Sequence, residues 1–565
     1  MQKLSMEVRL LIAFLLMGVV LAVSNYLAPP QPAEPAKQAA TDAPKAAPAT
    51  APAAAPAAAT AANPAAPAAA VVPGAVQAEQ VEAFTVETDL HKVSFSNRGA
   101  TVHNWVLKKF KSNAGQALEL VNQKAVQTTG DKAIPAPFSL TFKNQPSNNP
   151  NDKLYKVTRS ADGMTVDFEY SDGRLTAKKT FTFTKSSYLV KVTSQVIENG
   201  VLLPHALVWR GGFGDATGIN PTADARSLYF DASKSSLEKQ QASDAKNGPV
   251  SVSGNYAFAG LEDKYFAAAA LPASAGTLEL TTYSDTFASA DGKDEAHVGA
   301  AIGGSGNNTF QLFVGPKDAD LLAQVEPRLP QLLDWGWFGL IAKPLFYGLK
   351  WLATSVTHNY GWAIVLLTIF INMALFPLKI TSMKSSKKMQ SIQPLVNKIN
   401  EKYKGLPMND PRKADQNTEL MDLYKAHGIN PVGGCLPMLI QIPFFYALYK
   451  TLSIAIEMRG AEWLWVMDLS QPEMLPAGIR ILPIILVVTQ FISQKMTPSP
   501  GMDPAQQKIM LFMPLLFGFM FWPASSGLVL YWLTSNVVSI AQQLLLNRNT
   551  AAPAVAVVVP PTKKR

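Results

Sequence analysis

WAIVLLTIFINMALFPLK, residues 362 to 379, is an apolar run that contains two polar side chains and ends in Pro377 and Lys379. At about 1.5 Å per helical residue it spans roughly 27 Å, close to the ~30 Å hydrocarbon thickness of a bilayer. Thr368, Asn372 and Lys379 are spaced four and seven residues apart, so they fall near one face of a helix. The run therefore predicts a membrane-spanning helix with one polar side.

Composition separates two halves of the chain. Of its 565 residues, 48% are hydrophobic and 16% are charged, yet the mean hydropathy is only +0.08 because a polar N-terminal half precedes an apolar C-terminal half. The net charge of +9 comes from Lys and Arg that flank the apolar runs, as the positive-inside rule expects. We therefore expect no direct sequence-specific nucleic-acid binding.

No motif for a cofactor or a metal occurs. The single cysteine excludes an intrachain disulfide, the six histidines are scattered, and neither HExxH nor CxxC is present. The glycine-rich piece after Trp209 has Thr217 where the third glycine of GxGxxG belongs, and GxxxxGK[ST] is missing. We expect no cofactor, no metal, no catalytic residue and no enzymatic activity.

The N-terminal region predicts an anchor followed by a tether. Residues 1–27 contain an apolar run of 18 residues after Lys3 and Arg9, which favours an uncleaved transmembrane anchor with a cytoplasmic N-terminus. Residues 28–78 are almost entirely Ala and Pro, a composition that cannot bury a core. We expect a linker there.

Residues 79–330 predict a large periplasmic all-β sandwich domain. Short alternating runs are separated by turn signals, as in TVDFEY (165–170), SDGR (171–174) and KKTFTFT (178–184). Further strands are expected at 91–96, 188–196 and 277–283. Trp209 is interpreted as a packed side chain beside a turn.

Residues 331–357 predict an interfacial helix on the periplasmic side. The segment 335–351, WGWFGLIAKPLFYGLKW, mixes aromatic residues with Lys343 and Lys350, and Trp, Tyr and Lys are typical of membrane interfaces.

Residues 380–428 predict a cytoplasmic helical hairpin. Nine basic residues from Lys384 to Lys425 outnumber five acidic ones, and apolar residues repeat at three and four on both sides of a break near 405–411. The basic face fits either a solvated surface near lipid headgroups or a docking arm, whose candidate residues are Lys387, Lys388, Lys398 and Lys402.

Four further apolar runs follow, giving spans at about 358–379, 434–456, 477–494, 509–522 and 527–547 within a core at 358–548. With the anchor they make six crossings. The basic tail at 549–565 places the C-terminus in the cytoplasm as well. The 509–522 run is short and carries Pro514, so it should thin the bilayer around it.

Several polar residues interrupt these runs, including Thr368, Asn372, Gln441 and Ser535. Polar groups are costly in hydrocarbon, so they should face one another or a hydrated cavity. Such a cavity fits a solute pathway or a site for polar segments of another protein.

Four motifs carry a family resemblance: NPVGGCLPMLIQIPFFYALY (430–449), DPAQQKIM (503–510), FMP (512–514) and SGLVLYWLTSNVVSIAQQ (526–543). They closely resemble the YidC/Oxa family of membrane protein insertases, in its Gram-negative YidC form. The resemblance is specific over about 335–548 and weaker over the β domain, where it implies a β-supersandwich.

The resemblance implies five core helices around a hydrophilic groove that is open to the cytoplasm and to lipid. The groove would receive the polar part of a nascent inner-membrane protein, either alone or with the Sec translocon and its accessory components. The basic hairpin would receive the client or the ribosome, and the protein would act as a monomer in the bacterial inner membrane. Carried over by motif, the groove residues are Thr368, Asn372, Gln441, Lys379 and Ser535, and the substrate-slide residues are Cys435, Pro437, Met513 and Pro514.

One position departs from the family pattern. Many members have an arginine where this chain aligns Asn372, and no other Arg or Lys occurs between Trp351 and Lys379. Asn offers only a neutral hydrogen bond, so our hypothesis is that Lys379 supplies part of the positive field.

Two other functions fit the sequence less well. A small-solute transporter or channel predicts repeats or intramembrane carboxylates, which the spans lack. An anchored periplasmic enzyme or carbohydrate-binding domain needs one anchor and not six spans.

Overall fold

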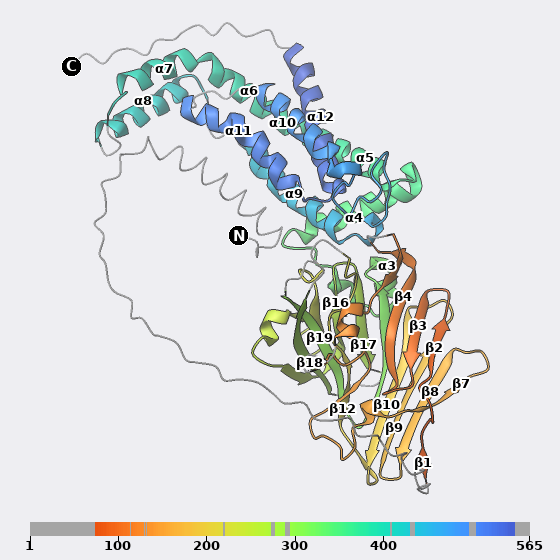
Figure 1. Ribbon diagram of the computed structural model, residues 1–565. Coiled ribbons are helices and arrows are strands. Elements are labelled where there is room, and N and C mark those ends of the chain that lie inside the picture. Colours follow the sequence, from red (N-terminus) through yellow and green to blue (C-terminus); the bar gives the residue numbers. More distant parts are fainter. Residues whose placement is uncertain are drawn as a thin grey trace, which may run out of the picture. The chain divides into compact units, whose positions relative to one another are not determined.

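The computed structural model describes residues 74–112, 115–128, 130, 133–217, 221–272, 277–288, 294–406, 410–429, 436–496 and 504–548. The predicted anchor, most of the predicted linker and the C-terminal tail lie outside these residues. The described part consists of a β region, followed in the chain by a helical region (Figure 1).

The β region is built from three antiparallel sheets. The largest has eleven strands, with β1-β8-β9-β10-β20-β17-β16-β13-β14 as its main path, while β7 pairs with β8 and β11 with β10. The others have the orders β15-β18-β19-β12-β6 and β2-β3-β4-β5. The strands are β1 (Ala75–Val76), β2 (Ala83–Glu87), β3 (His91–Ser96), β4 (Thr101–Lys111), β5 (Ala117–Glu119), β6 (Leu140–Phe142), β7 (Lys156–Arg159), β8 (Thr165–Asp172), β9 (Leu175–Phe183), β10 (Leu189–Glu198), β11 (Val201–Leu202), β12 (His205–Trp209), β13 (Arg226–Asp231), β14 (Ser236–Gln240), β15 (Val250–Gly254), β16 (Tyr256–Glu262), β17 (Phe266–Pro272), β18 (Leu278–Ala288), β19 (Asp294–Ser305) and β20 (Asn307–Pro316).

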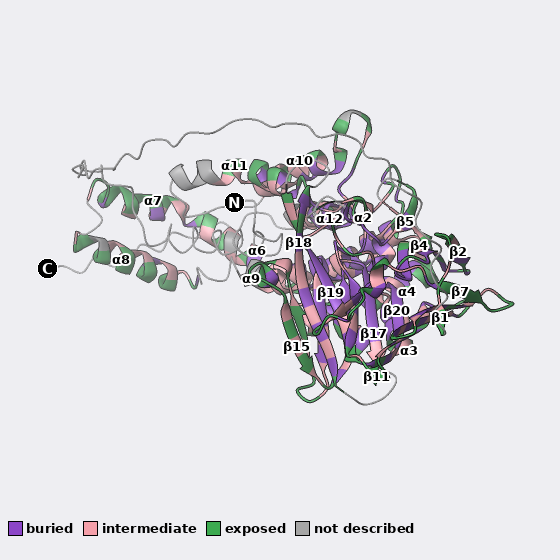
Figure 2. Ribbon diagram, turned by 60° about the horizontal axis from the view of Figure 1, so that its bottom comes forward, coloured by how far each residue is buried: buried purple, intermediate pink, exposed green. Residues whose placement is uncertain are grey.

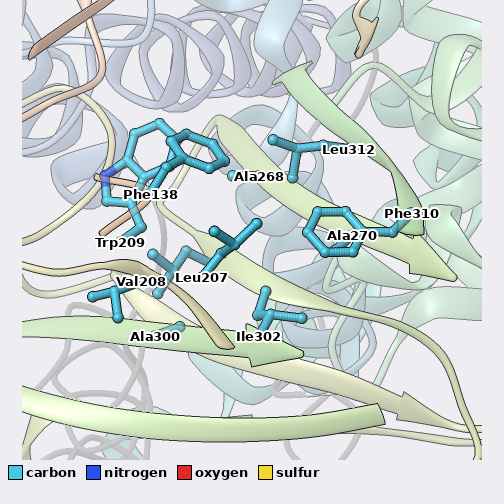
Figure 3. Close-up of a pocket in the computed structure, with 11 residues that line it drawn as sticks. Phe138, Leu207, Val208, Trp209, Ala268, Ala270, Ala300, Ile302, Phe310 and Leu312 are labelled. Carbon is cyan, nitrogen blue, oxygen red and sulfur yellow. The ribbon is translucent and has the colours of Figure 1, made fainter. Parts of the chain in front are cut away.

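The two smaller sheets pack against the large one, which makes a sandwich. Phe95 of β3 contacts Phe168 of β8 and Phe181 of β9, with ring centroids 5.7 and 5.1 Å apart. Figure 3 shows Leu207 and Ile302 of the five-stranded sheet beside a small apolar cavity that Leu312 of the large sheet also lines. Figure 2 shows the matching buried stripes along β17, β19 and β20. The predicted β sandwich is confirmed.

Trp209 lies inside this sandwich, as predicted from the sequence, which indicated a packed side chain beside a turn. Its side chain is 6% exposed, and its ring contacts those of Phe213, Trp105 and Phe138. The cavity of Figure 3 is lined by aliphatic and aromatic side chains, so it belongs to the core.

Lys179 of β9 is a charged residue in the middle of the β core. It is 1% exposed, and its Nζ donates to the backbone carbonyls of Gly99 (2.7 Å), Ala100 (3.2 Å) and Phe138 (2.6 Å). Burial lowers the pKa of its ammonium to about 7. The side chain therefore ties three segments of the sandwich together.

Among the residues that the structure describes, the helical region contains nine α-helices, which follow the short helices of the β region. Short helices α2 (Gln123–Gln127) and α3 (Ala319–Val325) precede it. Its α-helices, among the residues that the structure describes, are α4 (Gly339–Trp351), α5 (Tyr360–Ala374), α6 (Phe376–Ser391), α7 (Gln393–Lys402), α8 (Arg412–Ala426), α9 (Leu436–Ile454), α10 (Ile481–Met496), α11 (Pro504–Phe521) and α12 (Ser526–Arg548).

Two expected helices are broken in the structure. The run at 362–379 forms α5 and α6, which meet at Leu375, because Pro377 in the first turn of α6 has no N–H with which to continue α5. Lys379 therefore lies on α6. The first arm of the expected hairpin is likewise two helices, α6 and α7, since Pro394 lies in the first turn of α7.

The hairpin itself is closed by α7 and α8, which lie side by side in Figure 1. Ile392 and Val396 pack against Leu423 and Ile429 in a small apolar core. The Tyr403 hydroxyl adds a hydrogen bond of 2.9 Å to Glu419, and the outer faces of both helices are exposed in Figure 2.

Only a few of the described helices are long and apolar enough, by these two criteria alone, to count as membrane spans. Among the described residues one helix, Ser526–Leu546, is long and apolar enough to cross a membrane. The pair Gly339–Thr357 and Tyr360–Ala374 passes the same test together but is bent by 118°. The predicted 509–522 segment belongs to a longer helix, α11, which contains Pro514.

Candidate functional site: a polar cluster between α5, α6 and α12

A polar cluster occupies the seam between α5, α6 and α12. Thr368 and Asn372 of α5 are 0% and 3% exposed, and Ser535 of α12 is 6% exposed. Asn372 Nδ2 donates to the Thr368 carbonyl at 2.9 Å and to Ser535 Oγ at 3.4 Å. Four of the five predicted groove residues, Lys379 included, thus come together.

Lys379 completes the cluster from α6. Its Nζ donates to Asn372 Oδ1 at 2.7 Å, to Ser539 Oγ at 3.0 Å and to Gln542 Oε1 at 3.4 Å. Gln542 Nε2 in turn donates to the Asn372 carbonyl at 3.3 Å. α6 begins after the break at Leu375, and Lys379 on its first turn reaches both Asn372 of α5 and the polar side chains of α12. A cationic side chain therefore lies beside Asn372.

The ammonium of Lys379 has neutral partners. Its three acceptors are an amide oxygen, a hydroxyl oxygen and a second amide oxygen. Among the described residues no carboxylate lies within 4.0 Å of Lys379 Nζ. The cluster therefore carries a net positive charge in a partly buried setting, where Coulomb attraction is stronger than in water.

Gln441 lies apart from this cluster. It is a half-buried residue of α9 whose side chain is hydrogen-bonded to the hydroxyl of Tyr531 on α12. A second polar seam joins α10 to α12, where Asn536 Nδ2 approaches Thr489 Oγ1 (3.4 Å) and Trp532 Nε1 approaches Gln490 Oε1 (3.2 Å).

The predicted slide residues are described in part. Cys435 lies outside the described residues, and Pro437 lies in the first turn of α9 with its side chain outside the described set. Met513 is half-buried and Pro514 is buried on α11. Beside them the outer face of α11 is apolar and exposed, with Phe512 at 66% and Phe519 at 82%.

The four hairpin lysines lie on two helices. Lys387 and Lys388 are on α6, and Lys398 and Lys402 are on α7, where Lys402 is paired with Glu419 of α8. Lys388, Lys398 and Lys402 are exposed.

Sequence reasoning missed Lys450, which lies in the middle of an apolar run. This residue of α9 is 3% exposed and its Nζ donates to Asp334 Oδ2 at 2.8 Å. Its neighbour Thr451 donates to the Ala342 carbonyl of α4 at 3.1 Å. A lysine within YALYKTLSI was the available signal, and the pair links α9 to the segment that enters α4.

No metal site accompanies the cluster in the part of the chain that the structure describes, where no group of three or more His, Cys, Asp or Glu side chains is placed to hold an ion. Its side chains supply hydrogen bonds and one positive charge. Such a set can solvate a polar or acidic segment within a helical core.

Known proteins match both regions of the chain. A family profile described as 60Kd inner membrane protein matches residues 351–553, and a profile described as YidC periplasmic domain matches residues 83–348. A solved structure titled "Active YidC insertase crystal structure with the first transmembrane domain resolved" is 20% identical, covers 83% of this chain and 93% of its own, and has a TM-score of 0.36.

Two curated relatives extend over most of the chain. The membrane protein insertase YidC of Geotalea daltonii is 35% identical over 558 residues, which is 97% of this chain and 100% of the relative. That of Pelobacter propionicus is 36% identical over 503 residues, 85% of this chain and 89% of the relative. With profiles matching both regions and relatives of this identity, the chain belongs to the YidC family of membrane protein insertases, which are inner-membrane proteins with a periplasmic domain.

Proposed function

We propose that this insertase works through the cluster of Thr368, Asn372, Lys379 and Ser535, which lines a hydrophilic groove for the polar part of a nascent membrane protein. The observation that carries the proposal is the Lys379 ammonium, held half-buried by neutral acceptors. Buried polar groups normally satisfy one another, whereas this set keeps a net charge free to attract a client.

The charge of the groove comes from Lys379 in this proposal. Asn372 occupies the position where the family resemblance implies an arginine, and its Oδ1 accepts a hydrogen bond of 2.7 Å from the Lys379 ammonium. The cation is thereby displaced toward the cytoplasmic end of the groove and fixed to α12. A translocated segment with Asp or Glu would meet it soon after entering.

The exit in this proposal runs along α9 and α11, the third and fifth crossings. Phe512 and Leu515 on the apolar face of α11 are 66% and 60% exposed. A client's apolar segment would pass along Pro437, Met513 and Pro514 into lipid, where burial stabilises it by about 25 cal/mol per Å². No fuel is required, because the groove only shortens the distance over which polar groups are desolvated.

The proposed topology has six crossings, formed by the anchor at 1–27 together with α5, α9, α10, α11 and α12. Both termini are cytoplasmic, α4 lies along the periplasmic interface, and the α7–α8 hairpin is the cytoplasmic receiving surface for clients or the ribosome. Exposed Trp337 (84%) and Leu340 (91%) at the start of α4 support an interfacial position. The protein acts as a monomer, alone or with the Sec translocon.

Site-specific photocrosslinking tests this function. A photoreactive residue at Met513 or Pro437 should crosslink to ribosome-bound nascent membrane proteins, while one at Lys191, an exposed residue of β10, should not. The opposing function is a small-solute transporter or channel. It would be favoured by solute flux through proteoliposomes together with no crosslink at Met513 or Pro437.

A further inference from the structure

The loop between α9 and α10 contains a tight, ordered turn. Trp463 and Val466 exchange two backbone hydrogen bonds of 2.8 Å, which close a two-residue turn made of Leu464 and Trp465. Glu473 holds the turn from the other side, since its carboxylate accepts from Trp465 Nε1 and from the backbone N–H of Leu482. The turn therefore has a fixed shape.

The turn presents large apolar side chains outward. Leu464 is 64% exposed, Met467 is 75% exposed and Trp465 is 38% exposed, whereas Trp463 is buried. We call Leu464, Trp465 and Met467 the apolar knob. Two carboxylate residues, Glu462 and Asp468, flank it in the sequence.

Leu464 occupies a backbone conformation that favours glycine. Its φ is +50°, in the left-handed region, where a side chain adds strain. Strained positions are retained where the side chain has a use. An exposed leucine with no packing role fits that description.

The turn that carries the apolar knob packs against the first turn of α5. Trp463 packs against Trp362, with ring centroids 5.6 Å apart, and Asn359 Nδ2 donates to the Glu462 carbonyl at 2.8 Å. The contact is close enough that a Cβ at Gly361 would lie 2.2 Å from the Trp463 ring. The turn is thus fixed to the end of a helix that enters the membrane.

We propose that the apolar knob inserts into the headgroup–acyl boundary of the periplasmic leaflet and anchors the α9–α10 loop to lipid. The inference rests on the proposed crossing by α5, which places the first turn of that helix at the interface. A lipid surface fits the knob better than a protein partner does, because Trp at this level is typical of membrane interfaces and the flanking carboxylates restrict insertion to a shallow depth.

An unnatural fluorescent amino acid tests the depth of the knob in proteoliposomes made of lipid and the full chain alone. At position 464 its emission should shift to the blue, and lipids with a quencher near the headgroup should quench it at least twofold more than lipids with a quencher at the chain end. The same probe at Lys191 should remain aqueous. Aqueous emission at 464 would overturn the inference and would favour a protein partner for the knob.

A probe at Trp362, which is 47% exposed, separates the two proposals. Quenching at 362 without quenching at 464 overturns the knob and leaves the crossing by α5 standing. No quenching at either position overturns the crossing itself.

The variant Leu464→Gly tests the side chain without removing the turn. Glycine accepts the left-handed conformation, so the melting temperature should be unchanged or higher. Quenching of a probe at Met467 should fall by at least half in this variant. Undiminished quenching, or a lower melting temperature, would contradict the role assigned to Leu464.

Discussion

In each region of this protein a lysine ammonium is held by three neutral oxygens, but the oxygens differ. In the β region Lys179 donates to three backbone carbonyls at 2.6–3.2 Å. In the helical region Lys379 donates to side-chain oxygens of Asn372, Ser539 and Gln542 at 2.7–3.4 Å. Backbone carbonyls are held in place by the main chain, here in turns of the β region, whereas side-chain amides and hydroxyls can rotate.

This difference in acceptors and in burial lets the same ammonium group have two different roles. Lys179 is almost fully enclosed and can exchange its partners only if the sandwich opens. Lys379 is half-buried, and in the proposed mechanism a client carboxylate replaces its most distant acceptor, Gln542. The first lysine therefore holds the fold together, and the second is the one that we propose for binding.

The largest expected effect is the loss of the three carbonyl contacts in the β region. Lys179→Met should lower the free energy of unfolding by about 3 kcal/mol, because buried carbonyls left without a donor cost about 1–3 kcal/mol each. Chemical denaturation of the purified chain in detergent, followed by tryptophan fluorescence, measures it.

The neighbouring lysine is the matched control. Lys178 is paired with Glu169 at 2.8 Å, but its side chain is 51% exposed. Lys178→Met should therefore cost less than about 1 kcal/mol. Equal losses in the two variants would contradict the structural role of Lys179.

The next effect is a pH dependence of the β region. Burial lowers the pKa of folded Lys179 to about 7, whereas in the unfolded chain it keeps its ordinary value of 10.5. Between these values the unfolded state binds more protons, so the free energy of unfolding should rise with pH, by about 2 kcal/mol from pH 7 to 9.

Below pH 7 both states are protonated, so this contribution should be constant. The same denaturation at pH 7, 8 and 9 measures the slope, and Lys179→Met should reduce it. An identical slope in that variant would show that other groups cause it.

A smaller effect, on the rate of client insertion, is expected from a change at Lys379. Lys379→Ala should slow insertion of a client with an acidic translocated segment about tenfold, a change of roughly 1.4 kcal/mol, because the groove loses its charge. In vivo insertion assays by protease accessibility measure it.

The control is the same client with its acidic residues neutralised, which should insert equally well in both backgrounds. Asn372→Arg combined with Lys379→Ala should restore insertion of the acidic client. Unchanged insertion in Lys379→Ala alone would refute the proposed role of this lysine.

The smallest effect belongs to an exposed lysine of the hairpin. Lys402 is 60% exposed in its pair with Glu419, and solvent screens such pairs so that they contribute little to stability. Glu419→Gln should lower the free energy of unfolding only slightly at low salt, and less at high salt. A loss as large as that of Lys179→Met would mean that burial is not what distinguishes these lysines.

Much of this arrangement could be predicted from the sequence. Alternation in TVDFEY predicted a strand within β8, and helical spacing placed Thr368 and Asn372 on one face of α5. Both patterns are local, because side-chain periodicity follows directly from backbone geometry. The end of α5 was not predicted, since Pro377 tolerates either a kinked helix or two separate ones.

By itself the sequence determined the order of elements, the polar stripe and the departure at Asn372, because these depend on residue identity and short-range spacing. Only the tertiary structure decided which side chains of other helices contact this polar stripe. Ser539 and Gln542 lie 160 and 163 residues after Lys379, and no local pattern reports a contact at that separation. The three acceptors of Lys179, 41 to 80 residues away, are backbone carbonyls, which no residue type reveals. Packing alone brings such groups to one ammonium.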